Sequence, residues 1–197
     1  MLIPFGLGLA AGTGQAPWGL WFVTVAALAF WLNRPKFTRR AAFCDGWLFG
    51  AGYFAVSLHW IVSPFLVDIG STGWMAPFAL ILMAGGAALF WAVASYVSRP
   101  GSMVSAGLMI AGAEALRSYL FTGFPWALLG HIWIDTPLAQ LAAFGGPHLL
   151  TLVTVMLGVA CALLLQRQIW AVTPPLAAVL GWVILSTGPV PDYTGPT

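Results

Sequence analysis

Charged residues are scarce in this chain. Only 6% of its 197 residues are Asp, Glu, Lys or Arg, whereas 60% are hydrophobic and the mean hydropathy is +0.93. Soluble domains have about a quarter charged residues, and these cover much of the surface. Seven basic and five acidic residues cannot form such a surface over a core of this size. We therefore exclude a water-soluble fold and expect lipid to be the solvent.

Residues that bind metals or act as nucleophiles are also few. The two cysteines, Cys44 and Cys161, have no metal-type spacing, and we interpret them as small apolar helix residues. His59, His131 and His148 lie in different segments, with no serine nucleophile motif nearby. We expect no metal and no cofactor. The net charge of +2 says little about acidic partners, and we expect no nucleic acid among them.

Long runs without any charge are abundant. The intervals 46–67, 69–98, 136–166 and 168–191 contain no Asp, Glu, Lys or Arg, and a membrane helix needs roughly 20 apolar residues. In lipid the backbone must satisfy its own hydrogen bonds, and these runs lack the alternation of a membrane barrel. The sequence therefore predicts an all-α, polytopic transmembrane helix bundle with about seven spans and no soluble domain.

Glycine, proline and polar residues divide the chain into these spans. The expected spans are residues 2–12, 18–32, 42–66, 74–97, 102–120, 141–165 and 169–186. A longer connection, 121–140, is rich in Gly, Pro and Trp, and residues 187–197 are typical of the start of a linker. Many of the eleven tryptophans lie near span ends, which is typical of an aromatic belt at the membrane surface.

The basic residues predict an orientation. The loops 34–40, 99–101 and 166–168 fall on one side of a seven-span bundle and contain six of the seven basic residues. Because cytoplasmic loops are enriched in Lys and Arg, we expect a cytoplasmic N-terminus and a C-terminus on the outer, periplasmic side.

Two charged residues lie well inside a predicted span. Glu114 and Arg117 are three positions apart, so they share one face of a helix and can pair there. An isolated ion at the bilayer centre costs about 2.5–3.5 kcal/mol or more. Two interpretations are open at this point, namely an ion pair that holds helices together and a site for a lipid headgroup.

The segment after this helix is irregular. Gly123 and Pro125 interrupt the helix beside Phe124 and Trp126, and irregular backbone at membrane depth must be buried in protein or face a cavity. We expect a re-entrant or interfacial loop lining a cavity open to the outer leaflet, or else an interfacial turn with aromatic anchors. The candidate residues for the cavity are Glu114, Arg117, Thr122, Phe124, Pro125 and Trp126.

Several of these motifs resemble one bacterial family. The motifs are GWLFGAGYF at 46–54, WI at 60–61, EALR at 114–117, LFTGFPW at 120–126, Gly130, DTPLAQLA at 135–142 and GG at 145–146. Together they resemble the membrane domain of apolipoprotein N-acyltransferases over nearly the whole chain. His131 departs from the pattern, since Tyr commonly stands after this glycine, and the first span is short.

The resemblance implies a bacterial inner-membrane enzyme of lipoprotein maturation. Such enzymes transfer an acyl chain from a phospholipid to the N-terminal amino group of the S-diacylglyceryl-cysteine of an apolipoprotein, through a thioester on a Cys–Glu–Lys triad. The resemblance places that triad in a periplasmic nitrilase-like domain after the helices, and neither Cys44, Cys161 nor Lys36 matches its motifs. We therefore expect a truncated chain with no catalytic residue, inactive alone. The partners implied are the phospholipid donor, the apolipoprotein acceptor and the membrane.

Two other classes of function stay open. A small carrier or channel subunit would use the helix face of Glu114 and Arg117 as its binding site, although the chain has no duplicated half of the kind that many transporters have. A purely structural membrane partner would bind lipid equally well without Arg117.

Overall fold

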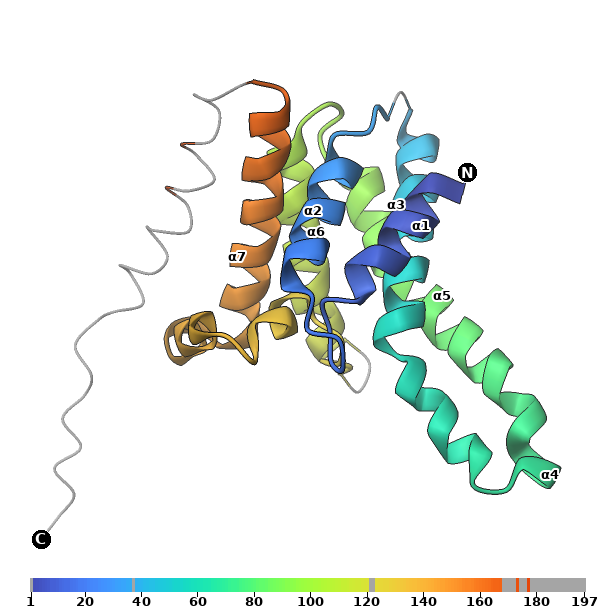
Figure 1. Cartoon of the computed structure of the whole chain (residues 1–197). Coiled ribbons are helices and arrows are strands. Elements are labelled where there is room, and N and C mark those ends of the chain that lie inside the picture. The colour runs from blue at the N-terminus through green and yellow to red at the C-terminus, as the bar shows by residue number, and fades with distance from the viewer. Residues whose placement is uncertain (1, 37, 121–122, 168–172, 174–176, 178–197) are drawn as a thin grey trace, which may run out of the picture.

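A computed structural model describes residues 2–36, 38–120, 123–167, 173 and 177, and within these residues it contains helices and no strand (Figure 1). The longer helices are α1 Leu2–Gly12, α2 Trp21–Leu32, α3 Arg39–Ser57, α5 Ala76–Val97, α6 Met103–Tyr119 and α7 Ala142–Leu165. Shorter segments between them are η1 His59–Leu66, α4 Ile69–Thr72, η2 Gly73–Met75, η3 Leu129–Trp133 and η4 Pro137–Leu141. The prediction of an all-α fold is confirmed.

Two helices begin at a hydroxyl side chain. The Thr38 hydroxyl accepts a hydrogen bond from the Ala41 N–H at 3.1 Å before α3, and the Ser102 hydroxyl accepts one from the Ser105 N–H at 3.2 Å before α6. Each cap satisfies a donor that the first helical turn leaves free. Gly101 precedes the second cap with φ +75°, a conformation that glycine adopts readily. These loop residues therefore determine where α3 and α6 begin.

Helix α3 packs tightly between α1 and α5. The approach is so close that a Cβ atom on Gly46 would lie 2.8 Å from the Trp91 carbonyl oxygen of α5. On the opposite side, a Cβ on Gly52 would lie 2.8 Å from the Leu9 nitrogen of α1. Small residues that allow backbones to approach are the usual means of packing helices in membranes.

Three buried aromatic rings join the helices around this crossing. The rings of Trp31 and Phe49 stack with centroids 4.5 Å apart, and those of Phe49 and Trp91 lie 5.6 Å apart. All three side chains are fully buried, and each aromatic pair contributes about 0.5–1.5 kcal/mol beyond its buried area. The rings come from α2, α3 and α5, so their contacts connect these three helices of the first half of the chain. Helix α7 packs against α2 and α6.

The expected spans are matched unevenly. Within the described residues, two helical stretches, Ile69–Val97 and Pro137–Leu165, are long and apolar enough to cross a membrane, and a third requires a bent pair. Helices α1 and α2 are apolar but have only 11 and 12 residues. The count of seven spans is therefore not confirmed. Apart from residues 173 and 177, the expected span 169–186 and the linker 187–197 lie outside the described residues.

The expected third span, 42–66, is not one continuous helix. Helix α3 ends at Ser57, and the chain bends by 47° into the 3-10 segment η1. Pro64 lies inside η1 and has no N–H to donate to a helix. The composition is apolar on both sides of the bend, so hydropathy alone does not reveal it.

The segment from η1 to the first half of α5 projects away from the other helices as an arm (Figure 1). Large apolar side chains on this arm are exposed: Phe78 by 59%, Ile81 by 67% and Leu82 by 73%. Burying such a side chain contributes about 1.5–3 kcal/mol relative to leaving it in water. The arm therefore suits a hydrocarbon environment and not an aqueous one.

Apart from the connection around α4 at the tip of the arm, the connections gather at two opposite ends of the bundle (Figure 1). At the basic end, residues from 33–39, 98–103 and position 166 surround one cavity. At the other end, here called the loop end, lie residues 13–20, 57–60 and 123–141. Three loops that are far apart in the sequence thus lie together, and two of them contribute basic side chains to the cavity.

Candidate functional site

Glu114 and Arg117 form an ion pair at the end of α6 that faces the loop end. The Arg117 Nη2 atom lies 3.1 Å from the Glu114 Oε1 atom, and the residues are 3% and 0% exposed. Removing two charges from water costs several kcal/mol per ion, unless further hydrogen bonds satisfy both groups. The surroundings of the pair must therefore provide these bonds.

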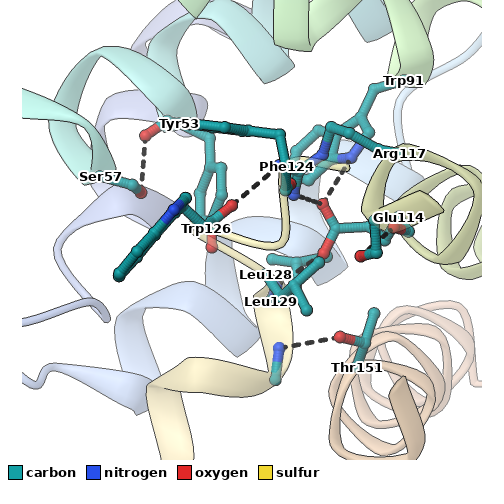
Figure 2. Close-up of polar contacts among 12 residues, drawn as sticks. Tyr53, Ser57, Trp91, Glu114, Arg117, Phe124, Trp126, Leu128, Leu129 and Thr151 are labelled. Atoms are coloured by element: carbon teal, nitrogen blue, oxygen red, sulfur yellow. Dashed lines mark hydrogen bonds and ion pairs between the residues drawn. The ribbon is translucent and has the colours of Figure 1, made fainter. Parts of the chain in front are cut away.

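The Glu114 carboxylate receives hydrogen bonds on both oxygens. The Trp91 indole N–H donates to Oε1 at 3.2 Å, and the backbone N–H of Leu129 donates to Oε2 at 2.8 Å (Figure 2). The first donor comes from α5 and the second from η3. A single buried carboxylate therefore connects α5, α6 and the irregular segment that follows α6.

The Arg117 guanidinium binds the same irregular segment. Its Nη1 atom donates to the carbonyl oxygens of Phe124 at 2.7 Å and Trp126 at 2.8 Å (Figure 2). The guanidinium also lies 5.0 Å from the ring centroid of Phe54, a cation–π distance. A planar group with several fixed donors suits this task, because one residue serves a carboxylate and two carbonyls at once.

Residues 123–131 obtain further backbone partners from distant side chains. The Gln15 amide donates to the Leu128 carbonyl oxygen at 2.8 Å, and the Gly130 N–H donates to the Thr151 hydroxyl at 3.1 Å. Buried backbone groups outside regular helices need such partners, most of all at membrane depth. The ion pair, Gln15 and Thr151 together hold this irregular segment in place at the loop end.

A cavity of about 380 Å³ lies beside this segment. The Trp60 and Trp126 side chains line it, with ring centroids 5.7 Å apart, and Gln15, His131 and Asp135 add polar groups. The volume falls within the usual range for small-molecule sites. Indole rings beside polar groups suit a ligand with both an apolar and a polar part.

His131 is the titratable ring of this cavity. Burial lowers its pKa below the ordinary value for histidine, and the charges of Arg117 and His148 act in the same direction. A neutral imidazole has one donor and one acceptor nitrogen. At neutral pH the ring therefore offers hydrogen bonds to a ligand and not a positive charge.

The predicted site residues occupy different positions relative to this cavity. Trp126 lines it and is 56% exposed, whereas the ion pair is buried and supports the wall behind it. Phe124 is half-buried, with its ring centroid 5.9 Å from the guanidinium of the pair, and Pro125 is exposed. Thr122 lies outside the described residues.

Sequence reasoning missed several residues of this site, among them Trp91, the cavity residues Trp60 and His131, and the residues Gln15, Tyr53 and Thr151. The Gln15 amide also donates to the Tyr53 hydroxyl at 2.6 Å, so it links the turn after α1 to α3 and to the 123–131 segment. Thr151 is a buried hydroxyl on α7. The sequence offered one signal for Gln15 and Thr151: a polar side chain in an apolar stretch needs a hydrogen-bond partner when it is buried.

The residue types of a Cys–Glu–Lys triad do not meet in this structure. The only glutamate is the buried partner of Arg117, and the only lysine, Lys36, lies 3.7 Å from Asp45 at the basic end. Cys44 is exposed on α3, and Cys161 lies on α7. Among the described residues, no three His, Cys, Asp or Glu side chains are placed to hold a metal ion.

Comparison with known proteins gives consistent matches. Residues 7–162 match the family model described as the apolipoprotein N-acyltransferase N-terminal domain. The chain is 39% identical over 172 residues to the apolipoprotein N-acyltransferase of Caulobacter vibrioides, a match that covers 82% of this chain and 32% of the relative. It is 35% identical over 193 residues to that of Rhodopseudomonas palustris, covering 88% and 36%. The chain thus spans about a third of the length of these relatives.

Proposed function

The chain belongs to the apolipoprotein N-acyltransferase family, and on this premise we propose that it forms the membrane domain of such an enzyme. The reaction would transfer an acyl chain from a phospholipid to the N-terminal amino group of S-diacylglyceryl-cysteine in a lipoprotein. The observation that carries the proposal is the match of residues 7–162 to the N-terminal domain of the family.

The loop-end cavity is the proposed place for the lipid part of a substrate. Trp60 and Trp126 provide apolar faces, and Gln15 and His131 provide neutral hydrogen-bonding groups. Both proposed substrates, the phospholipid donor and the diacylated acceptor, have an apolar part and a polar part. Glu114 and Arg117 act indirectly in this proposal, because they hold the 123–131 segment that forms one wall.

We further infer an inner-membrane location, with the loop end on the periplasmic side and the N-terminus in the cytoplasm. The gathering of three basic loops at the opposite end supports this orientation, because cytoplasmic loops are enriched in Lys and Arg. Seven crossings would follow if the short helices α1, α2 and α6 and residues 169–186 also cross the membrane. Cysteine accessibility from each side of inverted vesicles tests the orientation.

We expect the 197-residue chain, purified on its own, to be inactive. Acyl transfer through a thioester requires a thiolate, a proton acceptor and a cation close together, and Cys44, Cys161, Lys36 and Glu114 do not provide this arrangement. Amide formation from phospholipid and a diacylated lipopeptide by this chain would contradict the expectation.

Lipopeptide binding tests the proposed role of the cavity. A fluorescent diacylated lipopeptide should bind the purified chain saturably in an uncharged detergent. Trp126→Ala should weaken this binding by about tenfold, since truncating a well-packed aromatic anchor commonly costs more than 1 kcal/mol. Trp74→Ala is the matched control, because Trp74 is also exposed, at 67% against 56% for Trp126, but belongs to η2 on the arm and does not line the cavity.

The structure gives no support to the carrier or channel alternative. That function needs the Glu114 and Arg117 face to be accessible to a solute, and the two side chains are 0% and 2% exposed. Their hydrogen bonds are directed to the backbone of the same chain.

A further inference from the structure

A second polar cavity lies at the basic end, far from the loop end. Its volume is about 400 Å³, and four basic side chains line it: Arg34, Lys36, Arg39 and Arg99. Among the described residues that surround it there is no Asp or Glu. Cations from two segments that are far apart in the sequence, 33–39 and 98–103, therefore converge on one space.

One carboxylate next to the cavity offsets this charge only in part. Asp45 lies 3.2 Å from the Arg34 Nε atom and 3.7 Å from the Lys36 Nζ atom. Asp45 is one carboxylate beside four basic side chains, so the basic side chains are in clear excess. Burial lowers the pKa of Lys36, and Asp45 counteracts this effect. The remaining positive charges repel one another unless an anion joins them.

Two helix N-termini point their positive ends at the same cavity. Thr38 caps α3, Ser102 caps α6, and both residues line the cavity. These helices have 19 and 17 residues, so each carries a full helix dipole. Free N–H groups and dipoles at helix starts favour phosphate groups.

A buried hydroxyl at this cavity has no partner within the described part of the chain. Ser95 is 3% exposed, lines the cavity, and its Oγ atom makes no hydrogen bond there. A buried polar atom without a partner is rare in folded proteins. The Oγ atom lies next to Gly46 at the crossing of α3 and α5, so Ser95 is a polar position at the edge of the cavity.

The positive-inside rule does not account for these features together. It explains why basic residues are frequent in loops on one side of a membrane. It does not require that the side chains surround one cavity with two capped helix starts and an unpartnered hydroxyl. Apolar residues also belong to the wall, among them Leu32, Met103 and Ala106.

We propose that the basic-end cavity is a binding site for a phosphate group, either in the headgroup of an anionic phospholipid or as free phosphate. In the proposed orientation the site would face the cytoplasmic leaflet, on the side opposite the loop-end cavity. Basic pockets between membrane helices on this side commonly bind anionic lipid headgroups. The site is therefore distinct from the one proposed for acyl transfer.

Ligand-dependent thermal unfolding of the purified, delipidated chain tests this site. In an uncharged detergent, the three probes are short-chain phosphatidylglycerol, phosphatidylcholine with the same chains, and inorganic phosphate. A ligand that binds the folded state raises the unfolding midpoint saturably. We expect phosphatidylglycerol to do so, and Arg99→Gln to weaken its apparent affinity about tenfold, the usual effect of losing a hydrogen bond to a charged group.

The control is Arg40→Gln. Arg40 is exposed and lies on α3 beside Arg39, but it does not line the cavity, so its loss should leave the affinity unchanged. If inorganic phosphate also stabilises the chain and Arg99→Gln removes the effect, the phosphate group alone is sufficient for binding. If phosphatidylglycerol stabilises the chain and inorganic phosphate does not, the lipid is required. Equal stabilisation by phosphatidylcholine, no saturable shift, or equal losses in both variants would overturn the proposal.

Discussion

The two ends of this bundle use arginine in opposite ways. At the loop end, Arg117 is 3% exposed, and its Nη1 and Nη2 atoms donate to two backbone carbonyls and a carboxylate. At the basic end, Arg99 is exposed and lines an open cavity together with three other cations. The same residue type therefore stabilises backbone at one end and leaves charge available for a ligand at the other.

The difference shows that the burial of an arginine side chain determines whether its charge binds groups of the same chain or stays accessible. A buried guanidinium without partners would be very costly, so it is found where it satisfies groups that would otherwise be unpaired. The 123–131 segment provides such groups, because its irregular backbone leaves the Phe124 and Trp126 carbonyls without helical partners. An exposed guanidinium stays hydrated at little cost, so it can bind an anion reversibly.

The largest effect is expected from Arg117→Ala. Breaking a buried ion pair leaves an uncompensated charge and costs about 3–5 kcal/mol, and the Phe124 and Trp126 carbonyls would also lose their donor. Arg99→Gln, the matched exposed arginine, should change stability by less than about 0.5 kcal/mol. Equilibrium unfolding in mixed detergent micelles measures both.

Arg117→Lys sharpens this test. Lysine keeps the charge but has no planar fork, so it should recover only part of the lost stability. Equal stability of Arg117→Ala and Arg99→Gln would show that the pair does not hold the loop end.

An intermediate effect is expected from Gly46→Ala. The new methyl group would contact the Ser95 side chain and lie 2.8 Å from the Trp91 carbonyl oxygen, and overpacking of this kind costs about 1–3 kcal/mol. Gly86→Ala on α5 is the control, since no atom lies within 4 Å of its added Cβ. The control should be neutral or stabilising by up to about 1 kcal/mol. Unfolding midpoints in detergent compare the two, and equal losses would contradict the close crossing.

The smallest effect is expected from His131. Because its pKa is lowered in the folded protein, the unfolded state binds more protons near the ordinary value of about 6.5. The contribution of His131 to the free energy of unfolding is therefore fully present above about pH 6.5. It decreases as the pH falls from there towards the pKa of His131 in the folded protein. Unfolding between pH 7.5 and 5 should show a smaller loss in His131→Gln than in the wild type. An unchanged pH profile would mean that His131 is not shielded as described.

Helix positions could be predicted well from the sequence, because local signals mark them. Helices α1, α6 and α7 lie within the expected ranges 2–12, 102–120 and 141–165, with a kink in α7 at Gly145 and Gly146. That these helices cross the membrane stays a prediction. The bend after Ser57 was not predicted, because the segments on both sides of it are apolar and carry no charge near the bend. The 47° angle depends on tertiary packing, which hydropathy does not encode.

The site was predictable only in part. Spacing predicts that Glu114 and Arg117 share a helix face, and their ion pair confirms that expectation. Their burial depends on the return of residues 123–131, which requires partners as distant as Gln15 and Thr151. No local pattern encodes that meeting. The direct role of the candidate residues in lipid binding stays a prediction.

One measurement tests the central claim that the loop-end cavity receives the lipid substrate. A photoreactive phenylalanine analogue at position 126 or, as the control, at position 74 is irradiated with a diacylated lipopeptide, and mass spectrometry identifies the adducts. We predict a saturable adduct at position 126 that unlabelled lipopeptide competes away, and only non-competed adducts at position 74. Equal, non-competed labelling at both positions would contradict the account.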